Sequence, residues 1–389
     1  MSLRTSLFRT SAFAPMLALA TLAVACSSGP APNTFGVVDG GTDPDADPFQ
    51  DPDANFKPGD GAVPPPVCAP DPGNYDVPGN NCDDDGDGQI DNVTPCDSSL
   101  AIAGPAADFA KAIGLCKGVL SATYTQGFGS NKAPDPNQHG ILNKFGNVIK
   151  PREGAAMGAL SSGWAREYDQ CFGQTTGPFK GGCDMTGVGT APPGYPKAAS
   201  GCAGASDVND VSTVKLVIKV PNNAKGLSFD FNFFSGEWPE FVCTSFNDAF
   251  IAYLKSTAFK SGTADNISFD SKNNPVSVNN GFFDRCSPGS GLNCSNFPSG
   301  YKYCAGGDSE LKGTGFYVPQ DSCFVGKTDS GGGGTGWLTT KAPVAGGETI
   351  TLEFMIWDTG DQAYDSSVLI DKFNWEGSDT TVGTFRPPT

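Results

Sequence analysis

Histidine is almost absent from this chain of 389 residues, which contains only His139. A Ser/His/Asp or Cys/His catalytic site would depend on that single residue, and zinc hydrolases need several histidines or free thiolates. His139 lies in the polar stretch APDPNQHG, so we expect it to be solvated. Phosphate-binding loops and dinucleotide fingerprints are also missing, because the glycine-rich stretches lack the required strand-to-helix setting. The sequence therefore offers little support for these enzyme classes.

Basic residues are scarce as well. The chain has 25 Lys and Arg against 42 Asp and Glu, a formal net charge of −17. Such an excess of negative charge repels nucleic acid, so we expect no nucleic-acid partner. The charge is uneven: residues 26–97 hold 15 acids and one base, whereas residues 98–389 hold 27 acids and 22 bases. The acidity therefore belongs mainly to an N-terminal arm.

A long apolar run occurs only at the N-terminus. Residues 1–25 combine Arg4 and Arg9 with the segment MLALATLAVA, which is typical of an export signal and short for a membrane span. The segment ends in AVACSS, which resembles a bacterial lipoprotein cleavage site. Cys26 would then be lipidated and would anchor an exported protein to the outer membrane or cell surface. Because Ala23 replaces the usual Leu, ordinary signal-peptidase cleavage is the alternative.

Residues 26–67 contain few apolar side chains and are dominated by Pro, Asp and Gly. Burial there cannot offset the entropy lost on ordering, so this segment is predicted to be a disordered acidic tether.

Cysteine is abundant, with 13 residues in the chain. Setting Cys26 aside leaves an even number, which suits full disulfide pairing in an exported protein. Short-range candidates are Cys171 with Cys183, and Cys286 with Cys294 or Cys304. Spacing alone does not fix the connectivity.

Helical signals are few, whereas strand signals are clear from about residue 210 onward. Residues 105–120 have helical character, but VSTVKLVIKV, LSFDFNFF and ETITLEFMI alternate apolar and polar positions. Period-two alternation without interleaved helices predicts a mostly β protein, an antiparallel, jelly-roll-like β-sandwich with a few short helices. We place this sandwich at residues 98–376, followed by a tail at 377–389.

An Asp-rich insert at residues 68–97 contains CDDDGDGQIDNVTPC, which matches three quarters of an EF-hand calcium loop. The loop lacks the final bidentate Glu, where Thr94 stands, so we expect modest calcium affinity. The alternative is an acidic turn clamped by a Cys82–Cys96 disulfide. The candidate calcium ligands of the insert are Asp83, Asp85, Asp87, Gln89 and Asp91.

A second group of motifs occurs in three stretches: FDFNFFSGEWPEF (229–241), NDAF (247–250) and DTGDQAYDSSV (358–368). In this order they resemble the patterns F-x-F-x-F-x-S-E-E-Y-P-E, N-D-x-F and D-x-G-D-x-x-Y-D-S-x-V of choice-of-anchor L domain proteins. The corresponding residues here are Ser235, Gly236, Glu237, Trp238, Pro239, Glu240, Asn247, Asp248, Asp358, Asp361, Asp365 and Ser366.

The resemblance implies an exported, anchored β-sandwich of poorly defined activity, covering most of residues 98–376. Gly236 departs from the family pattern, which has Glu at that place.

The acidic residues of these motifs lie at predicted strand ends. Asp358, Asp361 and Asp365 end one strand and begin the next, and Asn247 and Asp248 lie beside another. If these ends meet, their oxygens could hold a calcium ion that ties three loops together. One alternative is that the aspartates cap turns. Another is a carboxylate pair of a glycan hydrolase, Glu237 with Asp358 or Asp365.

Aromatic residues near these loops could form a binding face, for which Glu237, Trp238 and Tyr364 are the candidates. Trp337, Trp357 and Trp375 could also stack on sugar rings, although core packing is the alternative for all of them. Trp357 is predicted to point away from Ile356, outward or onto another layer. We therefore predict a lipid-anchored surface protein with a calcium-stabilised, non-catalytic sandwich that binds a glycan or a cell-surface protein. A glycan hydrolase and a purely structural envelope protein are the alternatives.

Overall fold

A computed structural model describes residues 68–387 apart from 167–184, 205, 240, 280, 287–303 and 318–331. The export signal, the lipidation of Cys26 and the acidic tether lie outside the described residues, as do Cys171, Cys183 and Cys294. The insert and the sandwich belong to the same compact unit, Pro64–Thr389.

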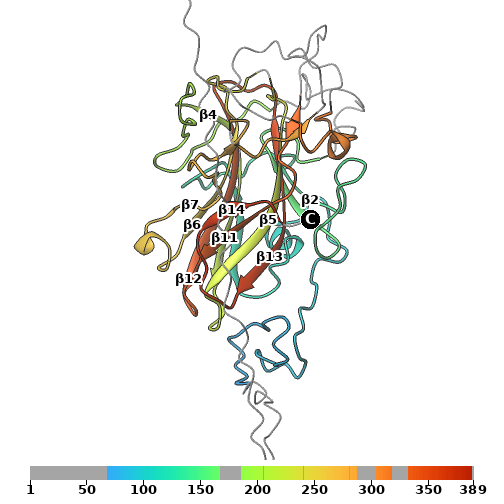
Figure 1. Cartoon of the computed structure of the whole chain (residues 1–389), viewed down its shortest axis with the longest axis vertical. Helices are drawn as coiled ribbons and strands as arrows, with labels where there is room; N and C mark the ends of the chain where they lie inside the picture. The colour runs from blue at the N-terminus through green and yellow to red at the C-terminus, as the bar shows by residue number, and fades with distance from the viewer. Residues whose placement is uncertain are drawn as a thin grey trace, which may run out of the picture. The chain divides into compact units, whose positions relative to one another are not determined.

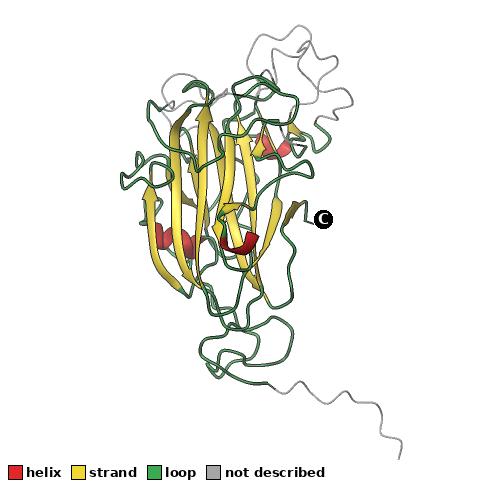
Figure 2. Cartoon of the chain, turned by 90° about the vertical axis from the view of Figure 1, so that its left-hand side faces the viewer, coloured by secondary structure: helices red, strands yellow, loops and turns green. Residues whose placement is uncertain are grey.

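Two antiparallel sheets face each other, and Figures 1 and 2 show their strands as two layers. Within the described residues, the first sheet has the order β1-β4-β12-β6-β7, with β8 pairing with β6. Its strands are β1 (Val119–Thr125), β4 (Val208–Lys219), β6 (Ala249–Lys255), β7 (Asp265–Asn266), β8 (Val276–Ser277) and β12 (Thr349–Thr359).

The second sheet has the order β14-β11-β5-β13-β3-β2, and β10 pairs with both β5 and β9. Its strands in the described part of the chain are β2 (His139–Leu142), β3 (Met157–Ser161), β5 (Gly226–Ser235), β9 (Arg285–Cys286), β10 (Gly333–Gly334), β11 (Leu338–Pro343), β13 (Ser366–Glu376) and β14 (Gly383–Phe385).

The alternation seen in the sequence produces the core. Phe229, Phe231 and Phe233 of β5 are fully buried between the sheets, opposite inward residues of β4 and β12 such as Leu216 and Phe354. Burying each such side chain contributes roughly 1.5–3 kcal/mol. The prediction of an antiparallel β-sandwich is confirmed.

The outward faces of the sheets are covered too. Trp357 is fully buried, and its ring lies edge-on to that of Tyr195, with 6.4 Å between centroids. It belongs to an outer cluster with Ile251 and Met355, so its side chain packs onto another layer, the second of the two predicted arrangements. Phe234 likewise packs outward, against Phe316. Loops thus cover the outward strand faces that the alternation in the sequence had predicted to be exposed.

The helices in the described residues are short: α1 (Ala106–Ala112), and the 3-10 turns η2 (Lys260–Gly262) and η3 (Ser309–Leu311). The helical prediction for residues 105–120 holds only in its first half. Gly114 and Gly118 adopt positive φ angles of 93° and 82°, and the chain then enters β1, where Leu120 is 61% exposed. None of the helices in the described part of the chain has the length and apolar character needed to cross a membrane.

His139 is not solvated, so that prediction is wrong. The residue begins β2 and is 9% exposed. Its ring stacks on Tyr124 with 3.6 Å between ring centroids. Burial is the main cause that lowers the pKa of His139 to about 4, so the imidazole is neutral. The polar residues before His139 suggested exposure, but Gln138 is itself buried. Its side-chain amide donates to the backbone carbonyls of Ser162 and Asp210.

Four disulfides lie within the described residues: Cys68–Cys82, Cys96–Cys116, Cys202–Cys243 and Cys286–Cys304. The predicted pairing of Cys286 with Cys304 is confirmed. The Cys82–Cys96 clamp is wrong, because each of these residues pairs outside the Asp-rich loop. Cys96–Cys116 instead ties the insert to the segment after α1.

Candidate functional site

The strand ends that carry the acidic motifs meet. Asp248, one residue before β6, bridges the end of β12 and the start of β13. Its Oδ1 accepts a hydrogen bond from the Thr359 backbone N–H at 3.2 Å, and its Oδ2 accepts one from the Ser366 hydroxyl at 2.7 Å. The Asp248 backbone N–H in turn donates to Glu237 Oε2 at 3.1 Å. The predicted proximity of NDAF to DTGDQAYDS is therefore present.

We call Glu237, Asp248, Asp358 and Asp365 the buried carboxylate cluster. Glu237 and Asp248 are each 1% exposed, and Asp358 and Asp365 are 0% exposed. Burial is the main cause that raises the pKa of Glu237, Asp248 and Asp358 well above its ordinary range. Repulsion between neighbouring carboxylates adds to it. Among the described residues no Lys or Arg forms an ion pair with Glu237, Asp248 or Asp358, so negative charge there lacks a basic counterion.

Hydrogen-bond donors to Asp358 are missing among the described residues. Both carboxylate oxygens of Asp358 and the amide oxygen of Asn247 are buried without a donor within the described part of the chain. Asp248 and Ser162 lie close enough to shift the pKa of Asp358, but neither donates to it in good hydrogen-bonding geometry. Buried acceptors without donors are rare and costly, so these oxygens need a proton or a cation.

Close packing holds Asp365, the remaining member of the cluster, in place. A Cβ atom at Gly163 would lie 2.2 Å from Asp365 Oδ2, so only glycine allows this approach. Gly236, where the family pattern has Glu, donates its backbone N–H to the Asp365 carbonyl at 3.0 Å. The cluster is thus built from the ends of β3, β5, β6, β12 and β13.

Other predicted residues do not join the cluster. Asp361 is exposed, and its Oδ1 accepts a hydrogen bond from the Ala363 backbone N–H at 3.3 Å, so the turn-capping alternative describes it. Tyr364 is half-buried and packs against Phe241, with 5.4 Å between ring centroids.

The predicted ligand face is wrong for Trp238 and Glu237, since each is only 1% exposed. The Trp238 ring stacks on Phe283 at 5.0 Å. Gly333 supports this packing, because a Cβ there would lie 2.6 Å from the indole.

The insert forms a second acidic group. Asp76, Asp83, Asp85 and Asp87 each place one carboxylate oxygen within 4.8 Å of the others. Backbone N–H groups hold this geometry: those of Gly86 and Gly88 donate to Asp83 at 2.7 and 2.9 Å. The Lys117 ammonium contacts Asp85 at 2.5 Å. Asp83, Asp85 and Asp87 are therefore brought together as predicted.

Asp91 is not part of this group, contrary to the prediction, because its two oxygens accept the backbone N–H groups of Asn80 and Asn81 at 3.1 Å each. Gln89 donates its backbone N–H to Asp87 at 2.9 Å, and its carbonyl as a ligand stays a prediction. The fourth carboxylate is Asp76, which sequence reasoning missed. It precedes the loop and accepts the Asp84 backbone N–H at 2.8 Å. The one sequence signal for Asp76 was its position just before a calcium-loop motif that lacks the usual final Glu.

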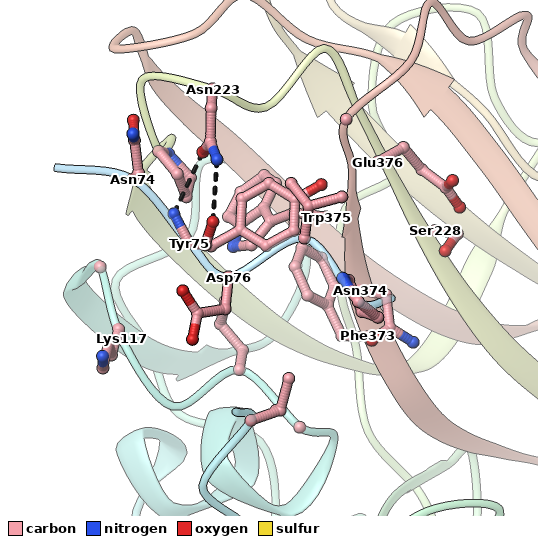
Figure 3. Close-up of a pocket in the computed structure, with 18 of the residues that line it drawn as sticks. Asn74, Tyr75, Asp76, Lys117, Asn223, Ser228, Phe373, Asn374, Trp375 and Glu376 are labelled. Carbon is pink, nitrogen blue, oxygen red and sulfur yellow. Dashed lines mark hydrogen bonds between the residues drawn. The ribbon is translucent and has the colours of Figure 1, made fainter. Parts of the chain in front are cut away.

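A cleft also lies where the insert meets the sandwich, with a volume of about 1250 Å³. We call it the insert cleft. Figure 3 shows Tyr75 of the insert beside Trp375 and Phe373 of β13. Sequence reasoning missed the cleft, because its walls come from opposite ends of the described chain.

Comparison with known proteins gives one match. The family model of the choice-of-anchor L domain matches residues 198–375. This range contains β4 to β13 and the buried carboxylate cluster except its contacts from β3, and it is shorter than the expected 98–376. No curated protein and no solved structure matches the chain. Such a domain indicates an exported, surface-associated protein. Residues 198–375 of this chain therefore match the choice-of-anchor L domain.

Proposed function

We propose that this chain is a lipid-anchored surface protein whose β-sandwich binds a ligand outside the cell and is stabilised by calcium at its strand ends. The observation that carries the calcium proposal is the buried carboxylate cluster, in which neither oxygen of Asp358 has a donor among the residues that the structure describes. Calcium favours carboxylate and amide oxygens and takes about six to eight of them. Asp358, Asp248, Asp365 and the nearby Asn247 offer such oxygens.

A cation there would do structural work. It would neutralise carboxylates that burial otherwise forces to hold protons, and it would join the β5–β6 and β12–β13 connections to the end of β3. The Asp-rich group of the insert is a second candidate for calcium. Its members Asp83 and Asp87 are less buried than the cluster, so we propose weaker binding at the insert.

The burial of the carboxylates supports binding rather than hydrolysis. A glycan hydrolase needs its two carboxyl groups in contact with the substrate and with water. Glu237, Asp358 and Asp365 are at most 1% exposed, so a polysaccharide does not reach them in this conformation.

Export and anchoring draw on different residues. The disulfides form in an oxidising compartment, which supports passage out of the cytoplasm. Cys26 would supply the membrane anchor and residues 27–67 the spacer. The ligand is a glycan or a cell-surface protein, and the net charge of −17 disfavours nucleic acid.

Glu237→Gln distinguishes a structural metal site from a catalytic pair. In calcium, we expect calorimetric unfolding of the mature protein to show a lower melting temperature for this variant than for the wild type, and a smaller difference between calcium and chelator. Asp379→Asn is the matched control, because its carboxylate is 93% exposed. The proposal fails if Glu237→Gln keeps the calcium response of the wild type while abolishing turnover of a glycan that the protein still binds.

A further inference from the structure

We infer that the insert cleft binds a neutral oligosaccharide, with Trp375 and Tyr75 as the platform on which the sugar rings pack. The inference rests on the proposed function, since it names the ligand class of a surface binding protein. It uses residues outside the buried carboxylate cluster, so the two proposals can fail separately.

The size of the cleft suits a chain of several sugars. Its volume of about 1250 Å³ exceeds the roughly 300–1,000 Å³ of pockets for drug-sized ligands. Its walls are the insert segment 72–78, residues 114–118, the β4–β5 connection and the C-terminal part of β13. The site is therefore extended and formed by several chain segments.

Two aromatic residues remain half-buried in these walls. Trp375 is held from behind by Phe373, whose ring lies at 86° and 5.0 Å from it. Its indole N–H makes no hydrogen bond within the described residues, so it is available to a ligand hydroxyl. Tyr75 is fixed by Asn223, whose amide accepts from the Tyr75 N–H at 3.0 Å and donates to the Tyr75 carbonyl at 2.8 Å. Preorganised aromatic surface of this kind packs well against the C–H face of a pyranose ring.

Amide side chains surround the aromatic platform. Asn74, Asn222 and Asn374 line the cleft together with Asn223. The Asn223 amide is engaged with Tyr75, and Asn74, Asn222 and Asn374 each donate one side-chain N–H within the protein, to Asp84, Asp71 and Lys372. Within the described residues, the carbonyl oxygen and the second N–H of these three amides make no hydrogen bond, which matches the mixed donor and acceptor character of sugar hydroxyls. Apolar faces with amides at their edges are complementary to a molecule that is apolar on its ring face and polar around its rim.

The lining holds five acidic residues and four lysines, and five of these nine residues form ion pairs. Lys117 pairs with Asp85 at 2.5 Å, and Lys341 with Glu376 at 2.8 Å. Asp230 pairs with Arg152 at 3.0 Å. Because acids and lysines in the lining are nearly equal in number, the cleft carries little net charge to attract an acidic glycan or a charged peptide. A neutral sugar chain is the ligand class that remains complementary.

Isothermal titration of the mature protein in calcium tests the inference. The probes are cellohexaose, xylohexaose, mannohexaose, maltohexaose and laminarihexaose, with an oligogalacturonate of equal length as the acidic comparison. We expect at least one neutral hexasaccharide to bind and Trp375→Ala to weaken that binding about tenfold or more, equivalent to about 1.4 kcal/mol. Trp375→Phe keeps a ring against Phe373 and should lose less. Trp337→Phe is the control, because Trp337 lies outside the cleft, against Arg152.

The inference is overturned if no neutral hexasaccharide binds, if only the oligogalacturonate binds, or if Trp375→Ala binds as tightly as the wild type and Trp337→Phe do. If Trp375→Ala does not fold, Trp375→Phe provides the test, because it must still bind the hexasaccharide more weakly than the wild type. A protein ligand whose capture needs Trp375 without any sugar binding would also contradict it. If calcium still stabilises the protein in these cases, the proposed function stands and only the sugar site fails.

Discussion

Removal of calcium should make the stability of this protein fall as the pH rises, and Asp358→Asn should reduce that fall. Burial and mutual repulsion raise the pKa of Glu237, Asp248 and Asp358 in the folded protein. The calcium-free folded state therefore binds more protons than the unfolded state above the ordinary carboxyl pKa of about 4. The stability that these protons provide is complete below that pH and is lost as the pH rises through the raised pKa values.

The size of the effect follows from the number of protons. Each extra proton held by the folded state costs about 1.4 kcal/mol of stability per pH unit. For the roughly 320 residues from 68 to 387, an unfolding entropy of about 2.1 cal/mol/K per residue converts this to about 2 °C per pH unit. Calcium at about a hundred times its dissociation constant should add about 2.7 kcal/mol, or about 4 °C. Because calcium requires ionised carboxylates, its contribution should grow with pH.

Differential scanning calorimetry from about pH 5 to about pH 8, in calcium and in chelator, measures both effects. Asp371, whose pKa burial raises to about 7, adds a similar slope to every variant, so the comparison between variants is decisive. In chelator, Asp358→Asn should melt higher than the wild type near pH 8 and show a shallower slope, with Asp379→Asn as the unchanged control. Equal slopes and equal calcium responses in wild type and Asp358→Asn would refute the reasoning.

Three further changes test other parts of the structure. Asp76→Asn should weaken calcium binding at the insert about tenfold in a calorimetric titration, whereas Asp91→Asn should change it less; the reverse order would show that Asp91 is the ligand. Trp238→Ala should lower the free energy of unfolding in urea by about 3–5 kcal/mol, as expected for a core residue, and a loss below about 1 kcal/mol would contradict its burial. Gly163→Ala should cost about 1–3 kcal/mol and reduce the calcium response, because the new Cβ meets Asp365. Gly383→Ala has open space and should be neutral, so equal effects at the two glycines would argue against the packing.

The sandwich could be predicted because its evidence is local. In β4, β5 and β12 the apolar residues alternate within a single strand, and that alternation alone specifies one face toward the core. β1 was missed because Ile113 and Leu120 have helical spacing with Phe109. The break depends on Gly114 and Gly118, whose positive φ angles become evident only in the fold.

The candidate site was predictable in part for the same reason. Asp248, Asp358 and Asp365 lie at strand ends, so a sandwich topology brings them together. Their complete burial was not predictable, because it depends on loops that cover the ends.

Trp238 and His139 were misplaced for a related reason. The residues next to each are polar in sequence, while the contacts that bury them come from other segments of the chain, Phe283 for Trp238 and Tyr124 for His139. The insert cleft was missed because Tyr75 and Trp375 lie at opposite ends of the described chain.

Counting bound calcium by native mass spectrometry tests the central claim most directly. The mature wild-type protein should retain two calcium ions, one at the buried carboxylate cluster and one at the insert. Asp358→Asn should retain only the ion at the insert. As free calcium is lowered, Asp76→Asn should lose the ion at the insert before it loses the ion at the buried carboxylate cluster. A wild-type protein that binds no calcium, or the same calcium count in wild type and Asp358→Asn, would contradict the account.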